Sequence, residues 1–306
     1  MTQSQRLFCF GYGYCCDYLG HDLLQQDGWH VGGTTRDPEK KTMLRERGVD
    51  THLFDLEAPL SDPEFILENV THLLISTPPD DEGDPTFLSH AEDILKLKNL
   101  KWIGYLSTTG VYGDRGGAWV DENSERRPTS KRGSRREKAE DQWLSLYKIY
   151  GLPVHIFRLA GIYGPGRSAL DSLRAGVARR IDRPGHAFSR IHVEDIVKIL
   201  QASFDKVNPG AIYNICDDEA APSHEVIAYA CGLLGRPVSP LIPFEQADIS
   251  PMARSFYSDN KRVHNDRMKS DLGIELLYKN YREGLKGCLD AEDYALSIFK
   301  SGGKLF

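Results

Sequence analysis

The segment RLFCFGYGYCCDYLG, residues 6–20, decides the fold of this chain. An apolar run, Leu7–Phe10, stops at Gly11, and apolar residues then recur at helical spacing up to residue 24. This pattern predicts a strand, a glycine turn and a helix. In such a turn Gly11 permits a tight bend, and Gly13 lets backbone N–H groups approach a pyrophosphate at the positive end of the helix. Cys16 replaces the third glycine of the dinucleotide pattern GxGxxG, so an ordinary glycine turn in an α/β core is the alternative.

The next predicted strand, Trp29–Thr34, ends in Thr34-Thr35-Arg36, about where a residue that contacts the cofactor ribose belongs. A carboxylate there accepts a hydrogen bond from the ribose 2′-OH and repels a 2′-phosphate. Here no carboxylate occurs before Asp37, and Arg36 can bind a phosphate. The segment therefore predicts NADP(H) as the cofactor, with NAD(H) left open.

The composition is that of a globular protein without a membrane span. The 306 residues are 40% hydrophobic and 27% charged, enough for one large domain or two smaller ones. A net charge of −6 argues against a dedicated nucleic-acid-binding protein. No room is left for a signal peptide before the first strand, no apolar run has membrane-spanning length, and the six cysteines form no CxxC pair. We expect a cytoplasmic protein with reduced thiols and no metal site.

Strands and helices continue to alternate along the first half of the chain. Helices are expected at 38–47, 63–68 and 86–97, and strands at 51–54, 72–77 and 102–106. This alternation predicts a parallel, doubly wound sheet of the Rossmann type, with ligands at the carboxyl ends of the strands. The candidate cofactor-binding residues are those that follow the strands: Gly11, Tyr12, Gly13, Tyr14, Cys15, Cys16, Thr34, Thr35, Arg36, Asp55, Leu56, Ser76, Thr77 and Pro78. Any one of them could instead be a plain turn former.

Beyond residue 105 the chain resembles a known family. The segments that carry the resemblance are LSTTGVYG (106–113), WVDE (119–122), FRLAGIYGPGR (157–167), RIHVEDIVKIL (190–200), IYNICDD (212–218) and LGIELLYKNYREGL (272–285). They resemble, in order, the extended short-chain dehydrogenases/reductases, the NAD-dependent epimerase/dehydratase family. The IYGPGR and IYNIC segments are most similar to its YeeZ-like branch of atypical members.

The resemblance implies two regions in the chain. Residues 1–165, with a return segment at 188–216, would form the dinucleotide-binding Rossmann domain. Residues 217–306, with an insertion at 166–187, would form a smaller region that covers the substrate. The implied ligands are a nicotinamide dinucleotide and a small anionic or sugar-like molecule. The oligomeric state is left open, with a homodimer as one option.

One departure from the family pattern concerns its Tyr-x-x-x-Lys motif, whose tyrosine transfers a proton and whose lysine holds the nicotinamide ribose. Aligned through Pro128 and Gly133, the two positions here hold Arg132 and Arg136. A guanidinium stays charged, so Arg132 cannot be that acid or base, whereas Arg136 can still hold a ribose hydroxyl. Thr108 falls where the family places its catalytic Ser or Thr.

Arg132 is expected to point inward. With Ser130 as the helix cap, residues 132, 136, 139, 143, 146, 147 and 150 share one helical face, which its apolar members make the buried face. An inward arginine needs a counter-charge, either Asp121 or Glu122 or an anionic ligand. The other basic residues between 126 and 138 face elsewhere and indicate a solvated surface rather than a nucleic-acid patch.

Six further residues are weaker candidates. Tyr112 and Tyr163 could each supply a phenol or simply pack, and Arg167, His186 and Arg190 flank the expected insertion and could equally lie on the surface. His192 is expected to be a packed residue.

Two functions remain open. The first is an atypical reductase or epimerase-like enzyme in which Thr108, Tyr112 or a water replaces the missing tyrosine. The second is a non-catalytic protein that senses the redox state of the dinucleotide. The sequence does not name the substrate or the direction of the reaction.

Overall fold

The computed structural model describes residues 4–300, without the side chains of Met252 and residues 292–300. A seven-stranded sheet forms its centre, in the order β11-β7-β5-β4-β1-β2-β3, and every neighbouring pair is parallel. Its strands are β1 (Gln5–Phe10), β2 (Trp29–Thr35), β3 (Asp50–Leu53), β4 (His72–Ile75), β5 (Trp102–Thr108), β7 (Val154–Leu159) and β11 (Ile212–Ile215). The expected Rossmann-type sheet is confirmed.

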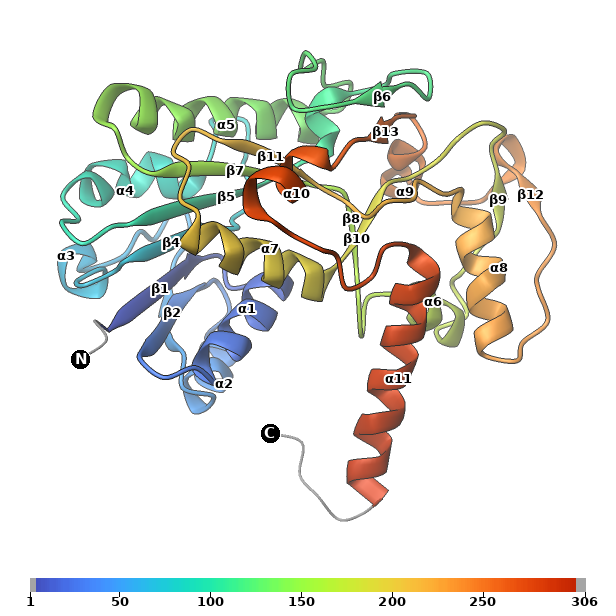
Figure 1. Ribbon diagram of the computed structural model, residues 1–306, viewed down its shortest axis with the longest axis horizontal. Coiled ribbons are helices and arrows are strands. Elements are labelled where there is room, and N and C mark those ends of the chain that lie inside the picture. Colours follow the sequence, from blue (N-terminus) through green and yellow to red (C-terminus); the bar gives the residue numbers. More distant parts are fainter. Residues whose placement is uncertain (1–3, 301–306) are drawn as a thin grey trace.

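Helices cover both faces of the sheet because successive strand side chains alternate between two apolar cores. From β1, Leu7 and Cys9 enter one core, and Phe8 and Phe10 enter the other. The first core lies under α1 (Tyr14–Leu24), α2 (Pro38–Glu46), α7 (Val193–Asp205) and α10 (Asp266–Leu272). The second lies under α3 (Pro63–Ile66), α4 (Pro85–Leu95) and α5 (Lys131–Tyr150). Figure 1 shows the two helical layers on opposite sides of the sheet.

Short-range signals explain where the helices begin. α2, α3 and α4 each start at an Asp-Pro pair, in which the aspartate accepts backbone N–H groups and the proline takes the first helical position. These capping residues are Asp37, Asp62 and Asp84. Ser130 caps α5 as expected, with its hydroxyl accepting from the Gly133 N–H at 3.1 Å.

The remaining elements lie beside the carboxyl ends of the strands, at the right of Figure 1. They include three parallel two-stranded sheets: β6 (Trp119–Val120) with β13 (Arg262–Val263), β8 (Gly161–Tyr163) with β10 (Arg190–His192), and β9 (Ile181–Asp182) with β12 (Ile242–Pro243). The helical elements are η1 (Thr109–Tyr112), α6 (Ala169–Arg174), α8 (Ser223–Leu233), η2 (Phe244–Gln246), α9 (Pro251–Phe256) and α11 (Tyr281–Lys300). A separate apolar core joins α6, α8 and α11. We call the segments 166–187 and 217–263 the roof.

The buried face of α5 is shorter than its periodicity predicted. Ala139, Trp143 and Leu146 are buried, as expected. Tyr147 and Tyr150 are 37% and 59% exposed, so their expected burial was wrong. Tyr147 lies over the loop at Gly210, where a Cβ on that glycine would collide with its ring.

The described part of the chain was also compared with the requirements of a membrane-spanning helix and of a metal site. No helix within residues 4–300 is long and apolar enough to cross a membrane. Within the same residues no three His, Cys, Asp or Glu side chains are grouped to bind a metal ion.

Candidate dinucleotide and ligand site

The glycine turn connects β1 to α1 and lies beside the end of β4, at the point where the strand order of the sheet reverses. Gly11 has a φ of +79°, and a Cβ there would lie 2.9 Å from the Thr77 backbone nitrogen, so no side chain fits. Its N–H donates to the Thr34 hydroxyl at 2.9 Å, which anchors the turn to β2. A Cβ on Gly13 would meet only the Gly11 carbonyl oxygen, at 3.8 Å, so the space above Gly13 is open. The turn therefore leaves its backbone approachable from one side.

Helix α1 begins at this turn without a side-chain cap, since Gly13 is its N-cap residue. The first N–H groups of a helix have no partner within the helix, and they favour an anion when no side chain occupies them. Tyr14 and Cys15, the first two helical residues, line the main cavity. The start of α1 thus has the features of a phosphate site.

Cys16 is fully buried directly beneath the turn. Its Sγ lies 3.6 Å from the Gly11 carbonyl oxygen, so the thiol packs against the end of β1. Tyr12 also points away from the open side, because its hydroxyl lies so close to Gly20 that a Cβ there would collide with it. The backbone N–H of Tyr12 donates to the Thr34 carbonyl at 2.7 Å, so Tyr12 supports the turn from inside.

The residues at the end of β2 make different contacts. Thr34 is buried and holds the turn, and the Thr35 hydroxyl accepts from the Asp37 N–H at 3.2 Å. The Asp37 carboxylate accepts from the N–H groups of Glu39 and Lys40, which commits it to the cap of α2. Arg36 is exposed, and no ion pair or hydrogen bond of its side chain occurs among the described residues. The guanidinium at this strand end is therefore available.

The other strand-end candidates differ in what they face. Ser76 lines the main cavity, whereas Thr77 is buried and its hydroxyl bonds to Asp84 and Thr86. Asp55 accepts from the N–H groups of Glu57 and Ala58 and so forms a turn. Leu56 and Pro78 are exposed and lie outside the lining of the main cavity.

The main cavity has a volume of about 920 Å³ and lies between the strand ends and the roof. Its lining combines the start of α1, the end of β5, the start of α5, the β7–β8 connection and residues 253–263. Five of its described lining residues are cationic and one is a carboxylate: Arg132, Arg136, Arg167, Arg190 and Lys261 against Asp259. That carboxylate already pairs with Lys261 at 3.2 Å and accepts from the Thr129 hydroxyl. The cavity therefore has an excess of positive charge.

Arg132 lines the cavity, as its helical face predicted, but it is exposed to solvent there rather than buried. Its guanidinium carbon lies 4.6 Å from the centre of the Phe256 ring, which belongs to α9 of the roof. Partial desolvation, and then the positive charge of Arg136, lower its pKa, but a guanidinium still remains charged.

No carboxylate pairs with Arg132 among the described residues, and both structural counter-charges considered above are committed elsewhere. Asp121 accepts from the N–H groups of Asn123 and Ser124, and Glu122 accepts from the Asn214 N–H at 2.8 Å. The expected alternative of a salt bridge to Asp121 or Glu122 is therefore wrong. The carboxylate whose charge acts on Arg132 is Asp259, in the same cavity and, within the described residues, without a direct ion pair.

Arg136 and Thr108 meet the cavity where β5 ends. Arg136 Nη1 donates to the Leu106 carbonyl at 2.6 Å and to the Tyr105 hydroxyl at 3.0 Å. The Thr108 hydroxyl accepts from the Gly110 N–H at 3.1 Å, which leaves its own proton for another acceptor. Both residues can hydrogen-bond a ligand in the cavity.

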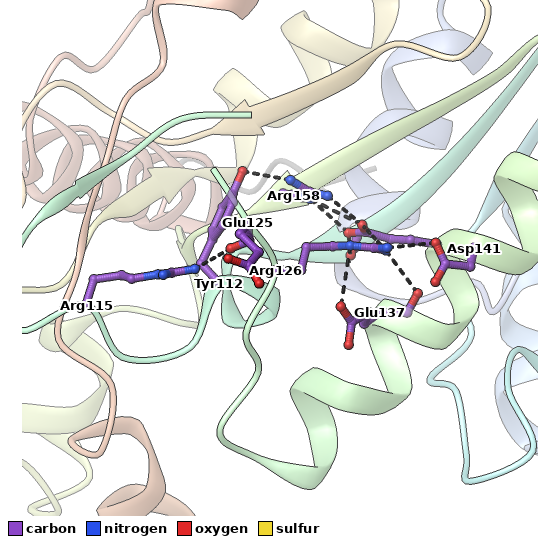
Figure 2. Close-up of polar contacts among 9 residues, drawn as sticks. Tyr112, Arg115, Glu125, Arg126, Glu137, Asp141 and Arg158 are labelled. Carbon is purple, nitrogen blue, oxygen red and sulfur yellow. Dashed lines mark hydrogen bonds and ion pairs between the residues drawn. The ribbon is translucent and has the colours of Figure 1, made fainter. Parts of the chain in front are cut away.

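Tyr112 is placed differently from the expected catalytic phenol. It is completely buried and outside the cavity lining, because its hydroxyl donates to Asn214 at 2.7 Å and accepts from Arg158 at 2.9 Å. Figure 2 shows the contact between Tyr112 and Arg158. The role of Tyr112 as a phenol in the cleft is corrected to a structural one.

The same network continues into α5 through a buried ion pair. Glu140 is fully buried and accepts from Arg158 at 2.7 Å, from Arg126 at 3.3 Å and from the Ser107 hydroxyl at 2.6 Å. Figure 2 shows Arg126 reaching along α5 toward Glu137 and Asp141. This network fixes the end of β5, from which Ser107 and Thr108 face the cavity.

Among the weaker candidates, Arg167 and Arg190 line the cavity and Tyr163 borders it. Arg167 lies over the Tyr14 ring, with its guanidinium carbon 5.6 Å from the ring centre. His186 is buried against the Asp259 carbonyl at 3.0 Å. His192 is a packed residue, as expected, since it is 1% exposed and its pKa is lowered by burial to about 4.

Sequence reasoning missed the contribution of residues 253–263. Phe256, Asp259 and Lys261 reach the cavity from a segment far along the chain. The only available signal was the charged and aromatic stretch RSFYSDNKR, which lies outside the segments that carry the resemblance.

Comparison with known proteins places these observations in a family. The chain is 30% identical over 218 residues to protein YeeZ of Escherichia coli K12, covering 68% of this chain and 76% of YeeZ. A functionally unknown conserved protein from Silicibacter pomeroyi matches with 48% identity and a TM-score of 0.86, over 94% of this chain and 99% of that one.

Distant structures share the fold. The UDP-glucuronic acid 4-epimerase of Bacillus cereus, solved with UDP-glucuronic acid and NAD, has a TM-score of 0.76 at 16% identity, over 95% of this chain and all (100%) of that one. A search against protein-family models found no match. The chain belongs to the same family as protein YeeZ of Escherichia coli.

Proposed function

We propose that the protein binds NADP(H) in the main cavity together with a small anionic or sugar-like ligand, as an atypical member of its family. The excess of cations in that cavity carries the proposal. A dinucleotide brings a pyrophosphate, which accounts for part of that charge, and a second anion beside Arg132 accounts for more.

The residues present fit the dinucleotide. The uncapped start of α1 and the open space above Gly13 suit the pyrophosphate, while a side chain at Gly11 would have closed the turn. Arg136 and Thr108 would contact the nicotinamide end, and Arg36 a 2′-phosphate. When bound, the group supplies hydride-transfer chemistry.

The chain's own residues would orient the ligand. Arg132 holds its anionic group, and the Thr108 hydroxyl donates to a ligand oxygen. Neither Arg132 nor Arg136 can exchange a proton near neutral pH, because a guanidinium remains charged there. An enzyme built this way must move its proton through Thr108 or a water.

A second function, a dinucleotide-sensing protein without catalysis, is favoured by one observation. The arginine expected at the position of the family's tyrosine lines the cavity, and the phenol of Tyr112 does not. Consumption of NADPH with any member of a panel of carbonyl compounds and nucleotide sugars separates the two functions. Turnover supports the enzyme, and binding without turnover across the panel supports the sensor.

The cofactor preference has its own test. A charge-assisted bond from Arg36 to a 2′-phosphate is worth about 1.5–3 kcal/mol, roughly a ten- to hundredfold preference for NADPH over NADH. Fluorescence titration should show this difference, and Arg36→Gln should remove it. Arg45→Gln, on the neighbouring helix α2, is the matched control. Equal affinities of the unmodified protein for the two dinucleotides would reject the preference.

A further inference from the structure

A second cavity, of about 530 Å³, adjoins the main one. Tyr163, Arg167, Arg190 and Ser223 line both cavities. Much of the rest of its lining is aliphatic, from Ala169, Ala175, Val177, Val226, Ile227 and Leu285. Three of its polar residues bond to one another or to the backbone. The Ser168 hydroxyl caps α6 and donates at 2.6 Å to the carboxylate of Asp171, which also lines this cavity, and the Ser172 hydroxyl donates to the Ser168 carbonyl at 3.1 Å. The inner part of this cavity suits an apolar group.

Arg190 lies at the wall shared by the two cavities. Its Nη1 donates to the carbonyls of Phe188 and Ala221, both at 2.8 Å. Those are its hydrogen bonds within the described residues, and no carboxylate there comes within ion-pair distance of it. Two neutral carbonyls leave the positive charge uncompensated.

Asp217 is the acidic residue whose charge acts on Arg190, but it does not form the ion pair that Arg190 lacks. Asp217 is 4% exposed, and its Oδ2 has no hydrogen-bond partner among the described residues. Burial raises the pKa of its carboxyl to about 8, which favours the neutral form near pH 7. Among the described residues no ion pair joins Asp217 to the Arg190 guanidinium, which lies in a partly desolvated place and bonds only to the two carbonyls.

We infer that Arg190 binds the carboxylate of a ligand whose apolar body fills the second cavity. The inference names a class of ligand for the proposed function. It rests on that proposal in one respect, that both cavities belong to one ligand site. One guanidinium matches one carboxylate in charge and geometry, and the aliphatic wall matches the rest of such a molecule. A nucleotide would leave its base edges and ribose hydroxyls without partners on that wall.

The binding test uses phenylbutyrate as the probe, with phenylbutanol and inorganic phosphate for comparison. Calorimetric titration should show phenylbutyrate binding, at least about tenfold weaker binding of the alcohol, and weaker binding of phosphate. Arg190→Gln should reduce phenylbutyrate affinity at least about tenfold, and Arg190→Lys less. Arg179→Gln is the matched control, because Arg179 also donates to two carbonyls, both at 3.0 Å, but is exposed and lines neither cavity.

A pH profile keeps the inference testable should Arg190→Gln fail to fold. The groups that face Asp217 are Arg190, Tyr163, Cys216, Asp218 and Glu219, and the last two are paired with Lys269 and Arg282. Above about pH 8 the ionised Asp217 should compete for Arg190, so phenylbutyrate affinity should fall. In Asp217→Asn, which keeps the shape of the neutral acid, that fall should disappear.

Several results would overturn the inference. In the unmodified protein these are an absence of phenylbutyrate binding, equal affinity for phenylbutanol, or higher affinity for phosphate than for phenylbutyrate. In the variants they are an unchanged phenylbutyrate affinity of a folded Arg190→Gln, or a pH profile of Asp217→Asn equal to that of the unmodified protein. NADPH titration of Asp217→Asn and Arg179→Gln, whose substituted residues line neither cavity, should give unchanged affinity. NADPH binding without phenylbutyrate binding would reject this inference alone, and the reverse would reject the proposed function alone.

Discussion

Replacing Glu140 by glutamine should destabilise the protein more than a change at a surface carboxylate. Glu140 is 0% and Arg158 2% exposed, and two guanidinium nitrogens of Arg158 donate to this carboxylate, at 3.0 and 2.7 Å. Glu140→Gln keeps the shape but removes the charge, which leaves the buried guanidinium unpaired. Breaking a buried pair in this way costs about 3–5 kcal/mol. The glutamine amide keeps a hydrogen bond with Ser107, through its oxygen or its N–H group, so the cost comes from the broken ion pair.

Urea denaturation, which gives the free energy of unfolding, measures this cost. Glu137→Gln is the control, because Glu137 is 30% exposed and lies 3.5 Å from Arg126. It should change stability by no more than about 1 kcal/mol. A Glu140→Gln protein within about 1 kcal/mol of the unmodified one would refute the reasoning, since the pair would then be solvated or replaceable.

Two further predictions concern buried residues. Cys16→Leu should cost about 1–3 kcal/mol by overpacking beneath the turn and should weaken dinucleotide binding, whereas Cys16→Gly should still bind; a leucine variant that binds NADPH normally would contradict the placement of the loop. Asp217→Asn should gain stability relative to the unmodified protein as pH rises. The pKa of Asp217 is about 8 in the folded protein and about 4 in the unfolded chain. Between these pH values unfolding therefore releases a proton, so the stability of the unmodified protein falls as pH rises. Asp217→Asn has no such proton to release and should not show this fall. Melting temperatures of both proteins between pH 5 and pH 8 measure this, and a constant difference would contradict it.

The fold could be predicted from sequence because its signals are local. The apolar runs, the glycine turn and the Asp-Pro helix starts each occupy a few neighbouring residues. The sheet order then follows from the parallel, doubly wound pattern. Even the start of α5 at Ser130 could be read from a single capping residue.

The site was harder to predict because its contacts join distant segments. Tyr112 is occupied by Arg158 and Asn214, which follow it by 46 and 102 residues, and nothing near position 112 reveals this. Asp121 and Glu122 stand close to Arg132 in sequence, but loop and strand contacts commit both of them. Burial raises the pKa of Asp217, and burial at that position depends on roof packing that no local pattern encodes.

The most direct test of the central claim is to measure Arg132→Ala for anion binding, NADPH affinity and melting temperature together. With NADPH present, citrate and UDP-glucuronate serve as anion probes, and Arg135→Ala, whose guanidinium pairs with Asp81 outside the cavity, is the control. The account predicts that Arg132→Ala loses the anion binding seen in the unmodified protein, while NADPH affinity and melting temperature stay nearly unchanged, because Arg132 has no carboxylate partner among the described residues. An Arg132→Ala protein with a lowered melting temperature and unaltered anion binding would contradict the account.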